Sequence, residues 1–172
     1  MLVVVWRFVT LMLASLAAGL TFGHLLQMPA RLGLDGTSWL TATRDAGSFG
    51  AVGTTIEIAA LLATVLLAIL VRGRGAPFVW SLVAVGLLLS AQVVWWLLVA
   101  PANAEIAVWR PDALPGDWQG WRDRWEQAQA ARALLQATAL GGLFLSVLLD
   151  VRPDPLAMSA HTAARRLGVR PR

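Results

Sequence analysis

The sequence has no cysteine, no tyrosine and no lysine, and it has only two histidines among 172 residues. Without cysteine the chain has no disulfide framework, no thiolate metal site and no dithiol redox relay, which excludes the thiol-linked membrane oxidoreductases. Charge is also scarce, since 14% of the residues are charged and 58% are hydrophobic. Soluble domains carry about 25% charged residues. With a mean hydropathy of +0.65, this chain belongs in a bilayer.

All of the basic residues are arginines, and they are scattered along the chain. The formal net charge is only +4. Proteins that bind nucleic acid gather their basic residues on one face or along one helix. We therefore expect no nucleic-acid partner, and we expect the lipid bilayer to be the main surrounding of the chain.

Long stretches with little charge predict four membrane-spanning helices. A helix needs about 20 largely apolar residues to cross about 30 Å of hydrocarbon, and four stretches meet this requirement. The sequence therefore predicts an all-α, integral membrane four-helix bundle. We expect this bundle in residues 1–150, with spans near 4–27, 51–71, 78–100 and 129–149, and a basic cytoplasmic tail in residues 151–172.

The distribution of arginine predicts how the helices are oriented. Segments 72–76 and 151–172 together hold seven arginines, whereas the longer connections 28–49 and 101–128 hold five. Short cytoplasmic segments carry an excess of arginine and lysine, so we expect a multi-pass protein of the cell membrane with both termini in the cytoplasm. The apolar N-terminus lacks the basic start of a signal peptide, and we expect it to be retained.

The connection between the third and fourth spans is rich in tryptophan. We expect Pro101 to end the third span and Asp117 to cap a helix that runs into the fourth. On that helix Trp118, Trp121 and Trp125 share one face. This connection, expected outside the cytoplasm, is either an aromatic belt at headgroup level or the roof of a pocket that opens outward.

Each predicted span carries one polar side chain that is costly to bury. These side chains are His24, Glu57, Gln92 and Arg132. Measured from the cytoplasmic arginines or Asp150, at about 1.5 Å per residue, all four lie roughly 22 to 27 Å along their helices. Ionisable groups within spans usually face the bundle interior and pair there. We therefore expect one polar layer in the outer third of the bilayer.

Glu57 leaves two interpretations open. A buried carboxylate is costly unless it is paired or protonated, so Glu57 either neutralises Arg132 or His24 as a structural lock, or transfers protons. In the second case His24, Glu57 and Arg132 are the candidate catalytic residues. The residues expected to line a substrate pocket are Gln27, Gln92, Trp96, Asn103, Trp121, Trp125 and Gln129.

The remaining charged residues near the spans are expected at the surface. Glu126 and Arg122 are four residues apart, a spacing typical of a solvated pair on a helix. Arg31, Arg44 and Asp45 are expected to be ordinary surface charges, although Arg31 continues the helical stripe of His24.

The sequence favours a site without metal or cofactor. It contains neither H-x-x-x-H nor E-x-x-H, and the second histidine, His161, falls in the predicted tail. Ligation of haem by two histidines across the bundle is therefore excluded, and the usual nucleophile, nucleotide and zinc motifs are absent.

Four short segments resemble a family of small four-span membrane proteins named for the anthrone oxygenases of polyketide pathways. The segments are Gly23-His24-Leu25-Leu26-Gln27-Met28-Pro29, then Glu57, then Pro101-Ala102-Asn103-Ala104, and finally Asp117-Trp118 through Arg122, Trp125, Glu126 and Arg132. The sequence departs from the family pattern at Gln129, where a histidine is often found. The resemblance covers most of the chain outside the tail.

This resemblance implies an oxygenase that uses O2 on an electron-rich tricyclic phenol. The residues are compatible with such chemistry, because His24 or Glu57 could act as a base and Asn103 or Arg132 could stabilise an enolate. We therefore expect a protein that binds, and is able to oxidise, a hydrophobic aromatic or quinone-type molecule. The alternatives are a non-catalytic membrane protein or subunit whose polar layer is structural, and, less favoured, a transporter.

Overall fold

The structure, a computed structural model, describes residues 1–47 and 50–150, and it is all-helical within them. The predicted tail 151–172 and His161 lie outside the described residues. The helices are α1 (Leu2–Leu32), α2 (Gly36–Gly47), α3 (Gly50–Leu70), α4 (Ala76–Val94), the π-helix η1 (Trp95–Val99), α5 (Ala100–Ala107) and α6 (Trp118–Asp150). Extended pairing in the described part is limited to one isolated bridge between Arg110 and Ala113.

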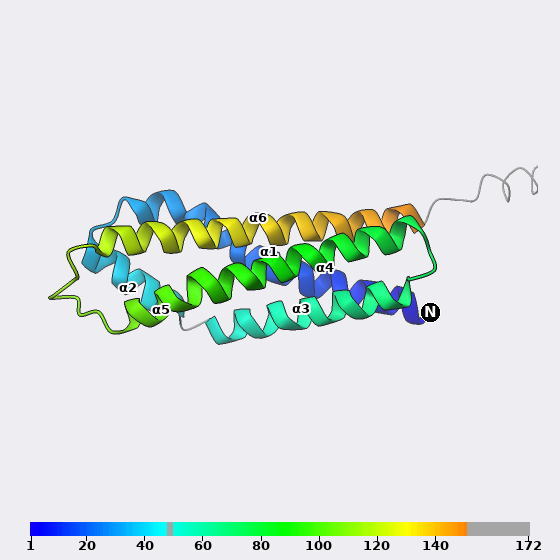
Figure 1. Ribbon diagram of the computed structural model, residues 1–172, viewed down its shortest axis with the longest axis horizontal. Coiled ribbons are helices and arrows are strands. Elements are labelled where there is room, and N and C mark those ends of the chain that lie inside the picture. Colours follow the sequence, from blue (N-terminus) through cyan, green and yellow to red (C-terminus); the bar gives the residue numbers. More distant parts are fainter. Residues whose placement is uncertain (48–49, 151–172) are drawn as a thin grey trace, which may run out of the picture.

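Four helical stretches of the described chain are long and apolar enough to cross a membrane: α1, α3, the continuous run from α4 to α5, and α6. In the bundle α1 packs against α3 and α6, and α4 also packs against α3 and α6 (Figure 1). The four therefore form a closed ring around one core. The predicted all-α class and the four apolar helices are confirmed, and together they suggest a multi-pass membrane protein.

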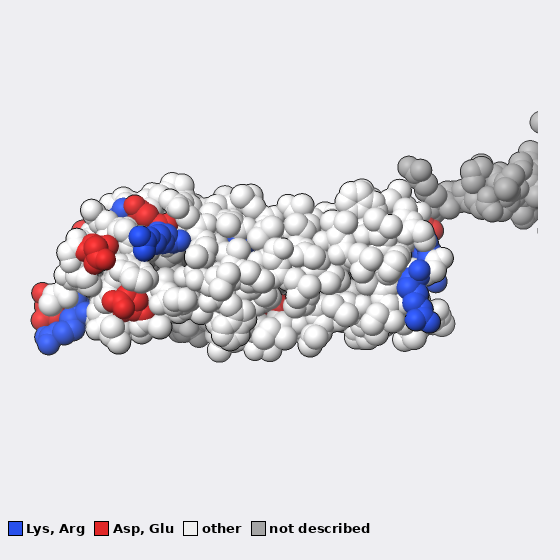
Figure 2. Space-filling model, viewed as in Figure 1, with Lys and Arg blue, Asp and Glu red and all other residues white. Residues whose placement is uncertain are grey.

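The outer surface of the bundle is apolar along its middle. Charged side chains gather at the two ends, and the band between them is almost free of charge on the face that Figure 2 shows. Large apolar side chains lie on the outside of the bundle, among them Phe8, Leu62 and Leu97, which are each more than 60% exposed. Such a continuous apolar surface is much larger than a soluble monomer exposes, and it suits contact with hydrocarbon.

The interior of the bundle is built largely from small residues. Ala17, Ala60, Ala84 and Ala139 are at most 1% exposed, and small side chains let membrane helices approach closely. Helices α4 and α6 approach closely at Gly142, where an added Cβ would lie 3.5 Å from the backbone oxygen of Trp80 and 3.8 Å from the Cβ of Ala84.

Gly142→Val is expected to loosen the bundle, because its γ-methyl groups would extend beyond a Cβ that already touches α4. Overpacking of this kind costs about 1 to 3 kcal/mol. The neighbouring Gly141 meets nothing within 4 Å, so Gly141→Val serves as the matched control and should change stability little. Thermal unfolding of both variants in detergent checks this prediction. Equal melting temperatures would contradict it.

The two ends of the bundle differ in their chemistry. At the end that holds the N-terminus, Asp150 forms ion pairs with Arg7 at 2.7 Å and Arg74 at 2.9 Å, so the first turns of α1, the loop before α4 and the last turn of α6 are joined. We call this the Asp150 end. The opposite end, formed by α2, α5 and the start of α6 (Figure 1), contains Trp39, Trp109 and Trp125 and is called the tryptophan-rich end.

Helix α2 was not predicted, because its sequence is polar and short. The backbone N–H of Ser38 donates to Oδ1 of Asp35 at 3.0 Å, which satisfies an N–H group that the first turn of a helix leaves free. Hydrogen bonds from Ser38 also hold the pKa of Asp35 below its usual value. The acid therefore remains a charged cap for α2.

The prediction that Pro101 ends the third span is wrong. Proline cannot donate a backbone hydrogen bond and its ring crowds the carbonyl four residues earlier. The chain adapts by widening into η1, where the N–H of Ala100 bonds the carbonyl of Trp95, and the helix then continues to Ala107. By contrast, the predicted helix start after Asp117 is confirmed, because α6 begins at Trp118.

Candidate functional site

Two groups of buried polar side chains lie inside the bundle. The mid-bundle cluster consists of Glu57, Gln92, Gln129 and Arg132. The end cluster, at the tryptophan-rich end, consists of His24, Arg31, Trp39, Thr43 and Glu126. The predicted single layer of polar groups from all four spans is therefore wrong in one respect, because His24 belongs to the end cluster.

The mid-bundle cluster joins three of the four spans. Nη2 of Arg132 donates to Oε2 of Glu57 at 2.5 Å, and Nε2 of Gln92 donates to the same oxygen at 3.2 Å. Nη1 of Arg132 donates to Oε1 of Gln129 at 2.5 Å. Since α3 and α6 lie across the ring from each other, the ion pair between Glu57 and Arg132 passes through the core. The structure thus brings together Glu57, Gln92 and Arg132, as expected from their depths.

Helix α1 contributes a different polar contact to this region. Oγ1 of Thr21 donates to Oε1 of Gln136 at 3.0 Å, and both residues are buried. Gln136 lies one turn beyond Arg132 on α6. Thr21 was not among the predicted site residues, although hydroxyl groups in membrane helices commonly form such contacts between helices.

The end cluster is centred on Glu126, whose side chain is 0% exposed. Its Oε1 accepts hydrogen bonds from Nε of Arg31 at 2.8 Å and from the indole Nε1 of Trp39 at 2.9 Å. Nη2 of Arg31 in turn donates to Oγ1 of Thr43 at 2.7 Å. Helices α1, α2 and α6 are held together by this one carboxylate.

Two sequence predictions about these charges are wrong. Glu126 does not form a surface pair with Arg122, which instead donates to Oδ1 of Asp123 and to the carbonyl of Leu32. Arg31 is 5% exposed rather than a surface charge. Both errors have the same cause. Helix α2 covers this end of α1, and this helix could not be predicted from the pattern of apolar residues. The surface positions of Arg44 and Asp45 are confirmed.

His24 lies against the second oxygen of Glu126. Its Nε2 is 3.5 Å from Oε2 of Glu126, and both atoms are buried without a hydrogen bond. The His24 ring meets the Trp125 ring edge to face, with centroids 4.9 Å apart, and its side chain keeps 19% exposure. The other ring nitrogen, Nδ1, is not among the fully buried unpaired atoms of the described residues. It is therefore not fully buried.

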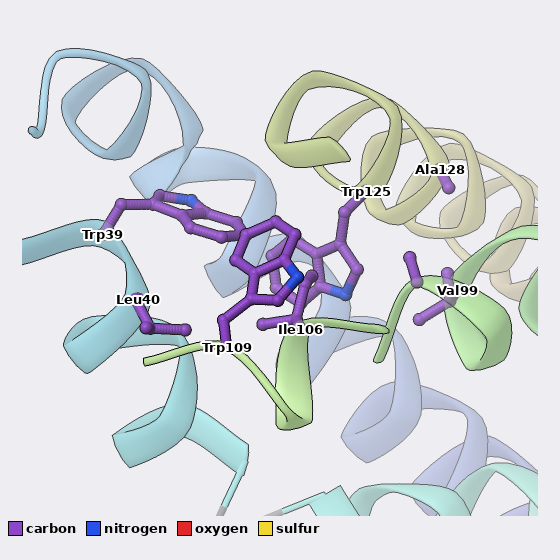
Figure 3. Close-up of a cluster of buried hydrophobic side chains, with 8 residues drawn as sticks. Trp39, Leu40, Val99, Ile106, Trp109, Trp125 and Ala128 are labelled. Carbon is purple, nitrogen blue, oxygen red and sulfur yellow. The ribbon is translucent and has the colours of Figure 1, made fainter. Parts of the chain in front are cut away.

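The tryptophans around His24 form a small core of their own (Figure 3). Trp39, Trp109 and Trp125 pack with Ile106 and Val99, and the rings of Trp39 and Trp125 are nearly perpendicular at 5.9 Å. The guanidinium of Arg31 lies 5.3 Å from the Trp125 ring centroid. These packed rings fix the side chains of the end cluster on three helices.

The predicted pocket-lining residues are spread over different surroundings. Trp125 is 5% exposed, and its Nε1 donates to Oδ1 of Asn103 at 2.7 Å, so its ring is part of the core rather than an open stacking surface. Trp121 is half-buried, whereas Trp96 is 67% exposed on the outside of the bundle. Gln27 is also exposed. The predicted residues therefore do not line one common pocket.

The acidic and histidine side chains of the described residues do not come together as a metal site, because no group of three or more of them is close enough. The expectation of a chain without cofactor stays a prediction. Compared with protein-family models, with curated proteins and with solved structures, the chain matches none of them.

Proposed function

We propose that the chain is a multi-pass protein of the cell membrane that binds a hydrophobic aromatic or quinone-type molecule and oxidises it in the manner of an anthrone oxygenase, with His24 as the base. The observation that carries this proposal is the geometry of Glu126, whose unpartnered Oε2 faces Nε2 of His24 at 3.5 Å. A buried carboxylate next to a histidine nitrogen is the arrangement that orients a catalytic imidazole.

Glu126 favours the tautomer of His24 that carries its proton on Nε2, because a carboxylate attracts an N–H group. Nδ1 then has a free lone pair, and of the two ring nitrogens it is the one that is not fully buried. Hydrogen bonds to a catalytic base often tighten only when the substrate binds. Arg31 pairs with Oε1 of Glu126, so Oε2 stays free to stabilise the imidazolium that forms when His24 takes up a proton.

The proposed reaction balances without a further reactant beyond O2. His24 takes a proton from the acidic methylene carbon of an anthrone, and the electron pair of the broken C–H bond enters the adjacent ring system as an enolate. The enolate carbon bonds to O2, which is reduced to a peroxide, and the peroxide takes the proton back from His24 to give a hydroperoxide. Loss of the second hydrogen from this carbon, with cleavage of the O–O bond, releases water and leaves a carbonyl, so one anthrone and one O2 give one anthraquinone and one water.

The proposed orientation rests on the distribution of arginine. Arg72 and Arg74 lie at the Asp150 end, and cytoplasmic loops carry an excess of basic residues. We place this end in the cytoplasm, so the tryptophan-rich end faces outward and its indoles lie near headgroup level. The end cluster then lies close to the outer membrane surface, where a lipophilic phenol reaches it from the bilayer.

A second function is favoured by the mid-bundle cluster. The ion pair between Glu57 and Arg132 crosses the core and has Gln92 and Gln129 on its flanks, as a structural lock between helices would. In a non-catalytic membrane protein or subunit this lock would be the main role of the polar groups. We assign the lock to Glu57 and Arg132, and the chemistry to His24.

Adding anthrone to the protein in lipid nanodiscs tests the proposal. Under nitrogen, NMR measures exchange of the methylene protons of anthrone with D2O. In air, oxygen uptake and anthraquinone absorbance measure oxidation. We expect both rates to exceed those of nanodiscs without protein. Equal rates with and without protein would overturn the proposed function and favour the structural alternative.

A further inference from the structure

The carboxylate of Glu57 is paired on one side only. Arg132 and Gln92 both donate to Oε2, and Oε1 accepts no hydrogen bond from the residues that the structure describes. Nη1 of Arg132 donates to Gln129, so Arg132 and Glu57 do not form the bidentate pair that arginine and carboxylate commonly make. One oxygen of a charged group at membrane depth is thus left without a donor.

This oxygen is not fully buried in the bundle. Among the described side-chain atoms that are fully buried without a partner, Nε of Arg132 is one and Oε1 of Glu57 is not, and Glu57 keeps 8% exposure. Figure 2 shows one small patch of an acidic residue and one of a basic residue in the otherwise white middle band. The neighbouring surface of α3 and α4 is apolar, with Ile58 47% and Val93 53% exposed.

The chemistry of this position selects its ligand. An unpaired carboxylate oxygen facing hydrocarbon is costly, and a hydroxyl group is a donor that a lipid-soluble molecule can carry. The ligand needs no positive charge, because Arg132 already neutralises Glu57. Trp95 and Trp96 lie one helical turn beyond Gln92, their rings in edge contact at 4.8 Å, and they offer an aromatic surface to a ring.

We propose that Oε1 of Glu57 is the docking point for the hydroxyl group of a phenol or hydroquinone that arrives through the bilayer between α3 and α4. This inference rests on the proposed function, because it names where the same class of ligand first binds. It goes further in assigning Glu57 a binding role on the outside of the bundle, separate from the base at His24. The ring of the ligand lies toward Trp95 and Trp96.

Decylhydroquinone and its dimethyl ether test the docking point, since they share a ring and an alkyl chain but only the first can donate a hydrogen bond. Binding to the full chain in nanodiscs is followed by quenching of tryptophan fluorescence. We expect the hydroquinone to bind about 10 to 100 times more tightly than the ether, the ratio typical of a hydrogen bond to a charged group. Equal affinities in the unmodified protein would overturn the proposal.

The double variant Glu57→Leu with Arg132→Leu removes the carboxylate without leaving a buried unpaired charge. Its affinity for the ether should stay near that of the unmodified protein, while its preference for the hydroquinone should be lost. Ser90→Ala is the matched control, because Ser90 is exposed on α4 and bonds only the carbonyl of Gly86 in its own helix. A preference that survives in the double variant would place the hydroxyl elsewhere and overturn the proposal.

The binding test of the docking point does not depend on whether the protein oxidises anthrone. If the hydroquinone preference depends on Glu57 but anthrone exchange equals that of empty nanodiscs, the docking point stands and the proposed oxidation fails. If exchange is catalysed and the two ligands bind equally, the oxidation stands and the docking point fails.

Discussion

Replacing His24 with glutamine is expected to slow methylene exchange of anthrone by about 10² to 10⁴-fold, the usual contribution of a positioned general base. Glutamine keeps an N–H group that can face Oε2 of Glu126, but it has no basic nitrogen to replace Nδ1. The measurement is the exchange rate by NMR at one fixed pH, with the unmodified protein and the variant compared at equal concentration in nanodiscs.

The matched control for His24 is the other histidine of the chain. His161→Gln makes the same chemical change at a position that the proposed reaction does not use, and its exchange rate should equal that of the unmodified protein. The affinity of His24→Gln for decylhydroquinone should also be unchanged. If His24→Gln exchanged the methylene protons of anthrone at the full rate, His24 would not be the base.

Replacing Glu126 with leucine is expected to destabilise the folded chain by about 3 to 5 kcal/mol, because it leaves the guanidinium of Arg31 buried without its counter-charge. The indole N–H of Trp39 would also lose its acceptor. Tryptophan fluorescence during thermal unfolding in detergent measures the loss. The double variant Glu126→Leu with Arg31→Leu should recover much of it, since no unpaired charge then remains.

Glu105 provides a control with the same chemistry at a more open position. Its Oε1 also accepts an indole N–H, from Trp109 at 3.2 Å, but Glu105 is only half-buried and no arginine pairs with it in the described structure. Glu105→Leu should therefore cost about 1 kcal/mol or less. If Glu126→Leu cost no more than Glu105→Leu, the end cluster would not hold the helices together.

The long helices could be predicted from the sequence because the bilayer imposes a length and an apolar composition on them. The same arithmetic placed Glu57, Gln92 and Arg132 at similar depths, and the structure shows them in contact. Depth along a helix axis is thus readable from residue numbers alone. The direction in which a side chain points cannot be read in this way, and for this reason His24 was expected in the layer of Glu57, whereas it lies against Glu126.

The end cluster could not be predicted because its charges lie outside the apolar stretches. Arg31 follows one predicted span and Glu126 precedes another, where charged residues usually meet water, and the unpredicted α2 helps to bury them. The residue numbers nevertheless contain a pattern that indicates the pairing of Arg31 with Glu126. On α1 and α6, the contacts of Arg7 with Asp150 and of Arg31 with Glu126 are separated by the same number of residues, as antiparallel helices in register require.

That shared register has a mechanical consequence. Three polar contacts along their length join helices α1 and α6. They are the ion pair of Arg7 with Asp150, the hydrogen bond of Thr21 with Gln136, and the ion pair of Arg31 with Glu126. Sliding one helix past the other by a single turn, about 5.4 Å, would break all three contacts at once. The pair therefore resists sliding and forms a rigid unit against which α3 and α4 pack.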